Sequence, residues 1–202
     1  MRDATVFLVD DDPSVRDSLS LLLSLKGLHT RIYASAERLL ETYDPGWRGC
    51  VLTDLKMPGM SGIELQHALA ARGARLPVVV LTAHGDVATT RLALKAGAFD
   101  FLEKPVDDAV LLDVLLNAIE RDRARHAAEA ERSVVEDRVA RLTPREREVL
   151  LLISRGLQNR EIGAELGISP RTVEVYKARM MEKLQCRSVA DAVRISLEVT
   201  QG

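Results

Sequence analysis

Acidic side chains, one threonine and one lysine follow short apolar runs at four places in the first 105 residues. Asp10 and Asp11 come after the first run, and Asp54 ends a later one. Thr82 and Lys104 follow two more. Carboxylate oxygens are the hard ligands that Mg²⁺ prefers, while a lysine and a hydroxyl group suit a phosphate. These residue types therefore predict a Mg²⁺-dependent phosphoryl site, provided that the fold brings them together.

Each of these residues also has a purely structural explanation when it is taken alone. Asp12 stands before a proline, so we interpret it as the cap of a helix and not as a metal ligand. Asp10 and Asp11 could be ordinary loop acids. Asp54 could cap the turn that follows it, and Lys104 could be a surface lysine. Their conjunction at four comparable positions favours the phosphoryl site.

Five β-rich runs alternate with amphipathic helical segments in residues 1–120. Such alternation favours an α/β fold, a doubly wound five-stranded parallel sheet with helices on both faces. Function in such sheets collects at the carboxyl ends of the strands, where the residues above lie. The predicted strands are 5–9, 28–33, 50–54, 78–82 and 99–103. The predicted helices are 13–27, 35–43, 61–73, 86–97 and 106–120.

The composition of the 202-residue chain is that of an ordinary globular protein, with 47% hydrophobic and 29% charged residues. The first apolar run is too short for a signal peptide, and the run at 108–119 is too short to span a bilayer. Cys50 and Cys186 form no CxxC pair, which excludes a disulfide scaffold and a zinc finger. We therefore expect a cytoplasmic protein that makes no contact with a membrane.

Charge and helical character change along the chain. Residues 1–120 carry a net charge of −5 and residues 121–202 a net charge of +3, which hints at two domains with different partners. Residues 121–141 contain eleven charged side chains and no glycine or proline, so we interpret them as a charged surface helix. The predicted organisation is one domain at 1–120, a charged helical linker at 121–141 and a second domain at 142–202.

The second domain is predicted to be a small all-α domain of four helices. The residues Thr-Pro-Arg-Glu at 143–146 form a capping box with proline at the first helical position, and Gly156 ends that helix. A second short helix covers 159–166. Ser169 and Ser188 can cap the third and fourth helices.

The third of these helices has two faces when its residues are placed at 100° intervals. The inward face holds Val173, Tyr176, Lys177, Met180 and Leu184. The outward face and its flanks hold Arg171, Thr172, Glu174, Val175, Ala178, Arg179, Glu182 and Lys183. Segment 171–187 has a net charge of +3, which suits phosphates, and a glutamate can accept from a cytosine amino group. An ordinary amphipathic helix fits the wheel equally well, but leaves the preceding short helix and glycine turn unexplained.

Two known families resemble this chain. VFLVDDD, LTDLKMPGMSGIEL, VVVLTAHGD and KAGAFDFLEKP are similar to the receiver domain of two-component response regulators. LTPREREVLLLISRGLQNREIGAELGISPRTVEVYKARMMEKL resembles a LuxR-type helix-turn-helix. The order of the segments and the AHGD sequence most resemble the FixJ subfamily. The resemblance implies a flavodoxin-like receiver with strand order 2-1-3-4-5. It further implies a transcription regulator that a sensor histidine kinase phosphorylates, and we expect this regulator to be an activator.

The resemblance also implies roles for the residues at the strand ends. Asp54 would be the nucleophile that accepts a phosphoryl group as an acyl phosphate. Asp11, Asp54 and the Lys56 backbone carbonyl would bind Mg²⁺ directly, and Asp10 would act mostly through water. Lys104 and the metal would offset negative charge on the transferring group. The receiver would then catalyse only its own phosphorylation and dephosphorylation, so the protein is not expected to be an enzyme.

Further residues would form the switch. Thr82 would turn to the new phosphate and Phe101 would swing inward, although Phe101 could also be a simple core residue. His84 could orient the water that hydrolyses the acyl phosphate, or could touch nothing. Phosphorylation would create a homodimer through the helix at 86–97 and the strand at 99–103.

The helix-turn-helix unit at 159–178 would bind promoter DNA, and RNA polymerase would be a further partner. Tyr176 stands where many members of the family have histidine, which leaves the target sequence open. The last helix would be the dimer contact on DNA. The DNA-contacting residues would be Arg171, Thr172, Glu174, Val175, Lys177, Ala178, Arg179 and Lys183.

The sequence argues against two other classes of protein. A Mg²⁺-dependent phosphatase with an aspartyl nucleophile would place a second acid two residues after the first, whereas Lys56 occupies that position after Asp54. A nucleotide-binding domain would need a glycine-rich phosphate loop, and neither GxGxxG nor GxxxxGK follows any predicted strand.

Overall fold

The computed structural model describes residues 4–83 and 97–200, and only the backbone of 197–200. A five-stranded, fully parallel sheet in the order β2-β1-β3-β4-β5 confirms the predicted fold class. Every strand lies within one residue of its predicted range. The strands are β1 (Thr5–Val9), β2 (His29–Tyr33), β3 (Gly49–Asp54), β4 (Val78–Thr82) and β5 (Asp100–Glu103). The helices beside the sheet are α1 (Pro13–Leu25), α2 (Ala36–Thr42), α3 (Gly62–Ala71) and α5 (Asp108–Ala140).

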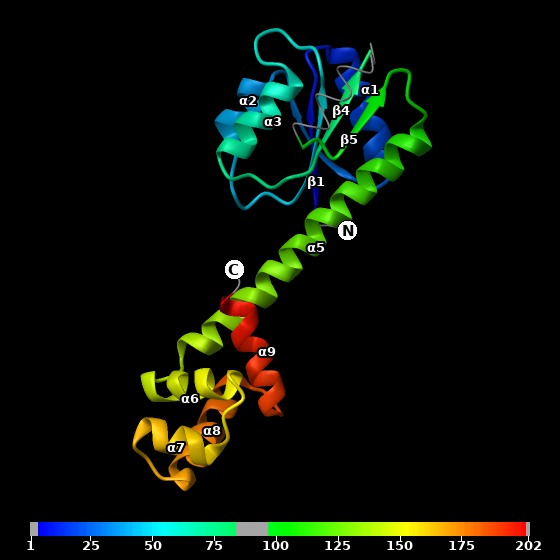
Figure 1. The fold of residues 1–202 in the computed structure, drawn as a ribbon. Helices are drawn as coiled ribbons and strands as arrows, with labels where there is room; N and C mark the ends of the chain where they lie inside the picture. The colour runs from blue at the N-terminus through cyan, green and yellow to red at the C-terminus, as the bar shows by residue number, and fades with distance from the viewer. Residues whose placement is uncertain (1–3, 84–96, 201–202) are drawn as a thin grey trace. The chain divides into compact units, whose positions relative to one another are not determined.

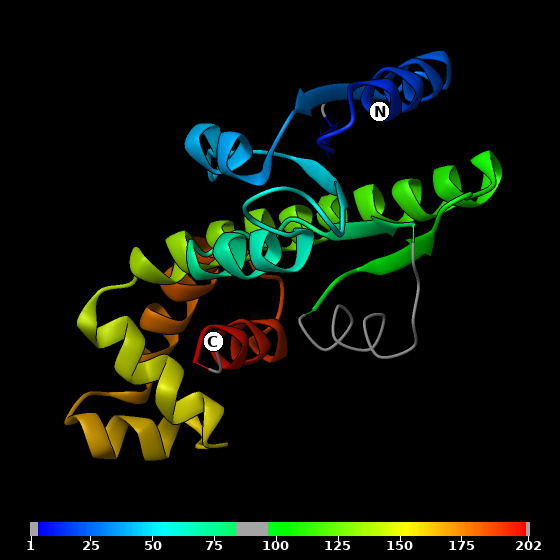
Figure 2. The same ribbon diagram turned by 90° about the horizontal axis from the view of Figure 1, so that it is seen from above.

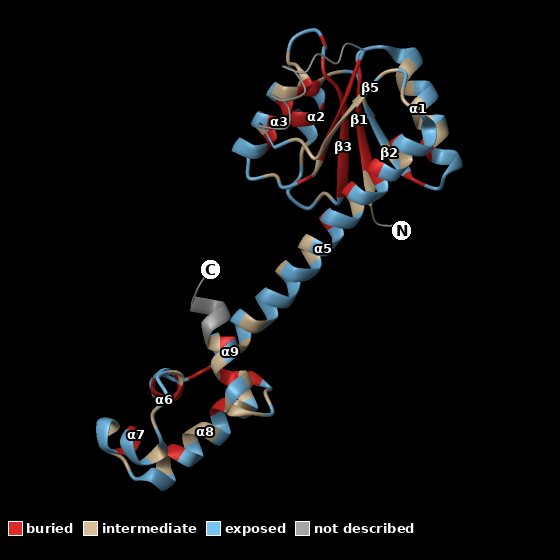
Figure 3. Ribbon diagram, turned by 45° about the vertical axis from the view of Figure 1, so that its right-hand side comes forward, coloured by how far each residue is buried: buried red, intermediate tan, exposed pale blue. Residues whose placement is uncertain are grey.

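The sheet lies between two helical layers, α1 with α5 on one face and α2 with α3 on the other (Figure 1). Side chains alternate between the faces along each strand, so Phe7 and Val9 point towards α2 and α3 while Val6 and Leu8 point towards α1 and α5. Both β1 and β3 are buried over nearly their whole length (Figure 3). The helix predicted at 86–97 lies outside the described residues, apart from its last residue.

The start of α1 follows from its sequence. Asp12 Oδ1 accepts a hydrogen bond from the Ser14 backbone N–H at 2.8 Å, and the proline after Asp12 occupies the first helical position. The interpretation of Asp12 as a helix cap is therefore confirmed. A second cap opens α3, where Ser61 and Glu64 form a capping box.

One continuous helix, α5, runs through the segment predicted as a linker. The chain divides into two compact units, Met1–His126 and Ala127–Gly202, so α5 contributes to both. The prediction of a surface helix is wrong at Asp122, which is only 2% exposed. Its carboxylate accepts a hydrogen bond from the Gly49 N–H at 2.8 Å and pairs with Arg125 at 2.6 Å. This part of α5 therefore docks on the beginning of β3.

The second unit is helical and has its own core. Its helices are α6 (Pro144–Ser154), α7 (Asn159–Leu166), α8 (Pro170–Leu184) and α9 (Val189–Thr200). These helices pack on one another, and Val135 and Val139 from the last turns of α5 pack against their core (Figures 1 and 2). Within the described part of the chain, no helix is long and apolar enough to cross a membrane.

The helix ends of the second unit are those expected from the sequence. Thr143 and Glu146 form a capping box at the start of α6, and Ser169 Oγ accepts from the Thr172 N–H at 3.0 Å at the start of α8. Gly167 has φ +66°, the left-handed conformation that ends a helix most easily at glycine. These caps set the short turn between α7 and α8.

Candidate functional site

Three charged side chains meet at the carboxyl edge of the sheet. Asp10 follows β1, Asp54 ends β3 and Lys104 follows β5. The Lys104 Nζ donates to Asp10 Oδ2 at 3.0 Å and to Asp54 Oδ1 at 2.7 Å. Asp10 is 2% exposed and Asp54 is 9% exposed. The fold thus brings together three of the residues that the strand ends pointed to.

Backbone amides fix the other oxygen of each carboxylate. Asp10 Oδ1 accepts from the Asp12 N–H at 2.9 Å, and Asp54 Oδ2 accepts from the Lys56 N–H at 2.7 Å. The Lys104 backbone N–H donates to the Thr82 carbonyl oxygen at 2.6 Å, which ties the lysine to the end of β4. Because each carboxylate is held from both sides, its direction at the sheet edge is determined before any ligand arrives.

The charge of Lys104 follows from its surroundings. Its partial burial disfavours the ammonium form, but the hydrogen bonds and negative charges of Asp54 and Asp10 outweigh that cost, so the pKa of Lys104 lies above its ordinary value. The side chain therefore stays positively charged at neutral pH. A fixed cation next to two carboxylates is an arrangement that can bind a phosphoryl oxygen.

The other residues predicted for this site differ in how far they are exposed to solvent. Asp11 is exposed beside Asp10, and the Lys56 side chain is exposed while its backbone adjoins Asp54. Thr82 is 1% exposed at the end of β4. Phe101 is half-buried and packs against the hydrophobic cluster on the α2–α3 face. His84 lies outside the described residues.

The donor set at the sheet edge fits Mg²⁺. In proteins this ion takes one or two carboxylates and fills its remaining positions with water and phosphate oxygens. Asp10 and Asp54 offer two such carboxylates, and the exposed Asp11 follows Asp10 in the chain. Among the described residues no group of three acidic, histidine or cysteine side chains is gathered as a metal cage. A site with few protein ligands is therefore the one that these residues can form.

In the second unit, α8 presents one face to solvent. Val173, Met180 and Leu184 are fully buried in the core of the unit. On the opposite side Arg171, Glu174, Val175, Ala178 and Arg179 are exposed, and Thr172 is half-buried. Together with Glu182, which is also exposed, the helix therefore carries two cations, two carboxylates and two small apolar side chains on a surface that a nucleic acid can reach.

Two lysines predicted to contact DNA have partners inside the unit. The Lys177 Nζ donates to Asn159 Oδ1 at 3.0 Å, joining α8 to α7. The Lys183 Nζ donates to Glu146 Oε2 at 2.7 Å, joining α8 to α6. Glu146 is 2% exposed, whereas the Lys183 side chain is 34% exposed, so the carboxylate end of this ion pair is the part that is removed from water. The sequence identified Glu146 as part of a capping box but contained no local signal for its second partner.

The ion pair makes the second unit sensitive to acid. Burial raises the pKa of Glu146, but hydrogen bonds from Lys183 and Thr143 overcome this effect, so its pKa lies below the ordinary value for glutamate. A carboxyl whose pKa is lower in the folded state stabilises that state above the unfolded pKa. That stability is lost as the pH falls through the folded pKa.

Both halves of the chain match known protein families. Residues 6–116 match the response regulator receiver domain, and residues 140–196 match the bacterial regulatory proteins of the luxR family. The first match contains the cluster of Asp10, Asp54 and Lys104, and the second contains α8.

Relatives and solved structures match nearly the whole chain. The transcriptional regulatory protein FixJ of Azorhizobium caulinodans is 46% identical, over 95% of this chain and 91% of the relative. The C4-dicarboxylate transport transcriptional regulatory protein DctR of Rhodobacter capsulatus is 43% identical, over 95% and 98%.

Among solved structures, the response regulator StyR has a TM-score of 0.88 at 42% identity, covering 97% of this chain and 99% of that one. Full-length FixJ from B. japonicum has a TM-score of 0.60 at 38% identity, covering 98% of each. The chain therefore belongs to the FixJ-like two-component response regulators, transcriptional regulators that join a receiver domain to a LuxR-type DNA-binding domain.

Proposed function

We propose that a sensor histidine kinase phosphorylates this regulator on Asp54. A carboxylate oxygen of Asp54 attacks the phosphorus of a phosphohistidine, a P–O bond forms, and the P–N bond breaks with its electrons returning to the imidazole nitrogen. The product is an acyl phosphate. The observation that carries this proposal is the Lys104 amino group, which lies 2.7 Å from Asp54 Oδ1 and 3.0 Å from Asp10 Oδ2. This charge stands where phosphoryl oxygens would arrive.

Asp11, Asp54 and the Lys56 carbonyl would hold Mg²⁺, with Asp10 acting mostly through water. When bound, the ion supplies positive charge to the transferring phosphoryl group. The chain's own residues orient the nucleophile, because the Lys56 amide holds one oxygen of Asp54 and Lys104 the other. The receiver catalyses only its own phosphorylation and dephosphorylation, so the protein is a switch and not an enzyme acting on a separate substrate.

The switch would run from the acyl phosphate to a homodimer. Thr82 would bind the new phosphate, and Phe101 would move with it. Phe101 lies in β5, the neighbour of β4, and is half-buried against the hydrophobic cluster on the α2–α3 face. The dimer would use the helix predicted at 86–97 and strand β5. We propose receiver, linker and DNA-binding segments at 1–120, 121–141 and 142–202, although contacts of Asp122 favour extending the receiver to 126.

The dimer would bind promoter DNA through the helix-turn-helix unit at 159–178 and contact RNA polymerase to activate transcription. The solvent-facing side chains of α8 support this role, with Arg171 and Arg179 suited to phosphates and Glu174 suited to a base edge. The last helix, α9, would supply the dimer contact on DNA. Since its target is the bacterial promoter, the protein would act in the cytoplasm.

Beryllofluoride with Mg²⁺ mimics the phosphorylated carboxylate and tests the proposed function directly. Sedimentation is expected to show twice the mass when both are added to the full chain. Selection from a pool of random duplex DNA is then expected to enrich two half-sites about one helical turn apart. An unchanged mass together with no enriched sequence would contradict a phosphorylation-controlled regulator. If beryllofluoride inhibited a phosphatase activity of the chain and caused no dimerisation, the result would favour a phosphatase.

Substitutions on α8 should separate phosphate contacts from internal ones. Arg179→Ala is expected to weaken binding to all sequences alike and to lower the slope of affinity against salt by about one unit. Lys183→Met removes the partner of buried Glu146, so it should lower the stability of the second unit and leave the salt slope unchanged. Glu174→Ala should relax preference at one base position. Equal salt slopes for Arg179→Ala and Lys183→Met would refute this division.

A further inference from the structure

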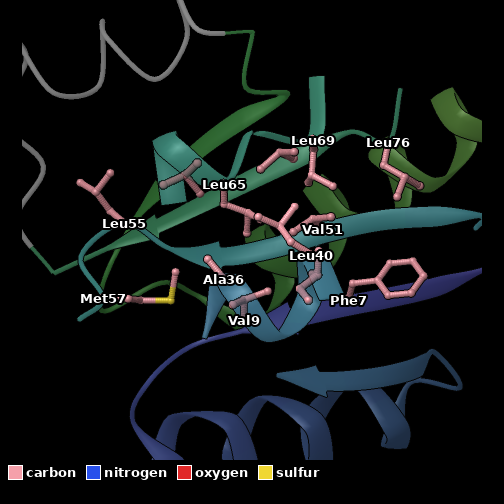
Figure 4. Close-up of a cluster of buried hydrophobic side chains, with 13 residues drawn as sticks. Phe7, Val9, Ala36, Leu40, Val51, Leu55, Met57, Leu65, Leu69 and Leu76 are labelled. Atoms are coloured by element: carbon pink, nitrogen blue, oxygen red, sulfur yellow. The ribbon is translucent and has the colours of Figure 1, made fainter. Parts of the chain in front are cut away.

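The loop between β3 and α3, residues 55–61, begins directly after Asp54 and supplies the backbone of the proposed site. Its first half is well anchored. The Lys56 N–H donates to Asp54 Oδ2 at 2.7 Å, and the Gly62 N–H donates to the Leu55 carbonyl oxygen at 3.0 Å. Met57 is 9% exposed and lies at one end of the hydrophobic cluster drawn in Figure 4. Residues 55–57 are therefore held by the sheet and the core.

The second half of this loop is held from a different element. Pro58 and Gly59 are exposed. The N–H of the next residue, Met60, donates to Glu37 Oε1 at 2.8 Å. Glu37 belongs to the first turn of α2, 23 positions earlier in the chain. One carboxylate thus ties α2 to the backbone of Met60, whose side chain packs against the same hydrophobic cluster as Met57.

The glycine at position 59 shows how closely this carboxylate approaches the loop. Gly59 has φ +77°, a conformation that other residues rarely adopt. A Cβ atom at this position would lie 2.6 Å from Glu37 Oε1, closer than such atoms come in proteins. The backbone conformation therefore favours glycine here, and a larger residue would also displace the Glu37 carboxylate. The carboxylate adjoins two consecutive residues of the loop.

Glu37 itself is firmly placed and charged. Its neighbour Ala36 and Leu39 in the next turn are fully buried, which fixes α2 against the sheet. Hydrogen bonds from its own backbone amide, from the Met60 amide and from the Ser35 hydroxyl favour the carboxylate form, so the pKa of Glu37 lies below its ordinary value. A charged acceptor makes a stronger hydrogen bond to an amide than a neutral one does.

We propose that Glu37 is a positioning residue for the phosphoacceptor site. Through the Met60 amide it holds residues 58–60, the part of the loop that follows the anchored residues 55–57, and so limits how far the Lys56 carbonyl can move from Asp54. Glu37 acts through this loop and not as a metal ligand, and its effect is exerted on the affinity for Mg²⁺. This inference rests on the proposed function, because it assigns the Lys56 carbonyl to the metal.

The test is Mg²⁺ binding to the unphosphorylated full chain, measured by titration calorimetry. Glu37→Ala should weaken Mg²⁺ about tenfold, the lower end of the range for residues that support metal ligands. Glu37→Asp keeps the charge but is one methylene shorter, so it should behave like Glu37→Ala. Glu37→Gln keeps an oxygen acceptor of the same reach and should stay close to wild type. Glu41→Ala, an exposed acid of α2 that pairs with Arg38, is the matched control and should bind normally.

Urea unfolding of the same variants separates positioning from general stability. The proposal is supported if Glu37→Asp unfolds near the wild-type midpoint and yet binds Mg²⁺ about tenfold more weakly. Variants that lose stability while Mg²⁺ affinity stays at the wild-type value would overturn it, with the proposed function intact. A wild-type chain that neither binds Mg²⁺ nor accepts a phosphoryl group on Asp54 would overturn the proposed function, and this inference with it.

Discussion

Asp54→Asn is expected to reduce labelling by acetyl phosphate and Mg²⁺ to the background level. The asparagine side chain has the same shape, and its oxygen can still accept the hydrogen bond that Asp54 Oδ2 takes from the Lys56 amide. It has no carboxylate oxygen to attack phosphorus, so no acyl phosphate can form. Mass spectrometry of the intact protein would measure the loss of the phosphoryl adduct.

Asp17→Asn provides a matched control, because Asp17 is an exposed acid of α1 away from the cluster. It should be labelled like the wild type. Trp47, the single tryptophan, stacks on Phe7 with ring centroids 4.0 Å apart, so its fluorescence reports whether the receiver is folded. Undiminished labelling of a folded Asp54→Asn variant would place the acceptor at another residue, and peptide mapping would identify it.

Asp122→Ala is expected to lower the free energy of unfolding of the first unit by about 2 to 3 kcal/mol. Asp122 is 2% exposed, and its carboxylate joins the Gly49 N–H to the Arg125 guanidinium. Alanine leaves the buried amide of Gly49 without its acceptor. It also takes one partner from Arg125. Urea unfolding followed by Trp47 fluorescence would measure the loss.

Two further variants show whether the loss of stability comes from the buried contacts of Asp122 or from removing a charge on α5. Asp113→Ala removes an exposed acid of the same helix and should change the free energy of unfolding by less than about 0.5 kcal/mol. Asp122→Asn retains an acceptor for the Gly49 amide but loses the charge. Its midpoint of urea unfolding should therefore fall between those of Asp122→Ala and Asp113→Ala. If Asp122→Ala and Asp113→Ala unfolded at the same urea concentration, α5 would not be anchored to β3 through this residue.

Much of the fold and of the receiver site could be predicted from the sequence. The strands of a parallel sheet share one carboxyl edge, so the positions of Asp10, Asp54 and Lys104 after their apolar runs were enough to predict their meeting. The outward face of α8 could also be predicted from the sequence, because helical periodicity separates Val173 and Met180 from Arg171 and Glu174. In both cases a local pattern and a regular geometry determine where side chains point.

The tertiary structure decided the contacts that no such regularity governs. Asp122 lies in a strongly charged segment, and the local sequence predicts a surface residue. It is nevertheless buried, because α5 docks on the start of β3, 73 positions away. The sequence predicts a DNA contact for Lys183 and no role for Glu37, yet Lys183 pairs with Glu146 and Glu37 accepts a hydrogen bond from the loop after Asp54. These long or buried side chains find their partners only when separate elements pack together. A repeat along one helix or strand carries no information about which residue of another element will face it.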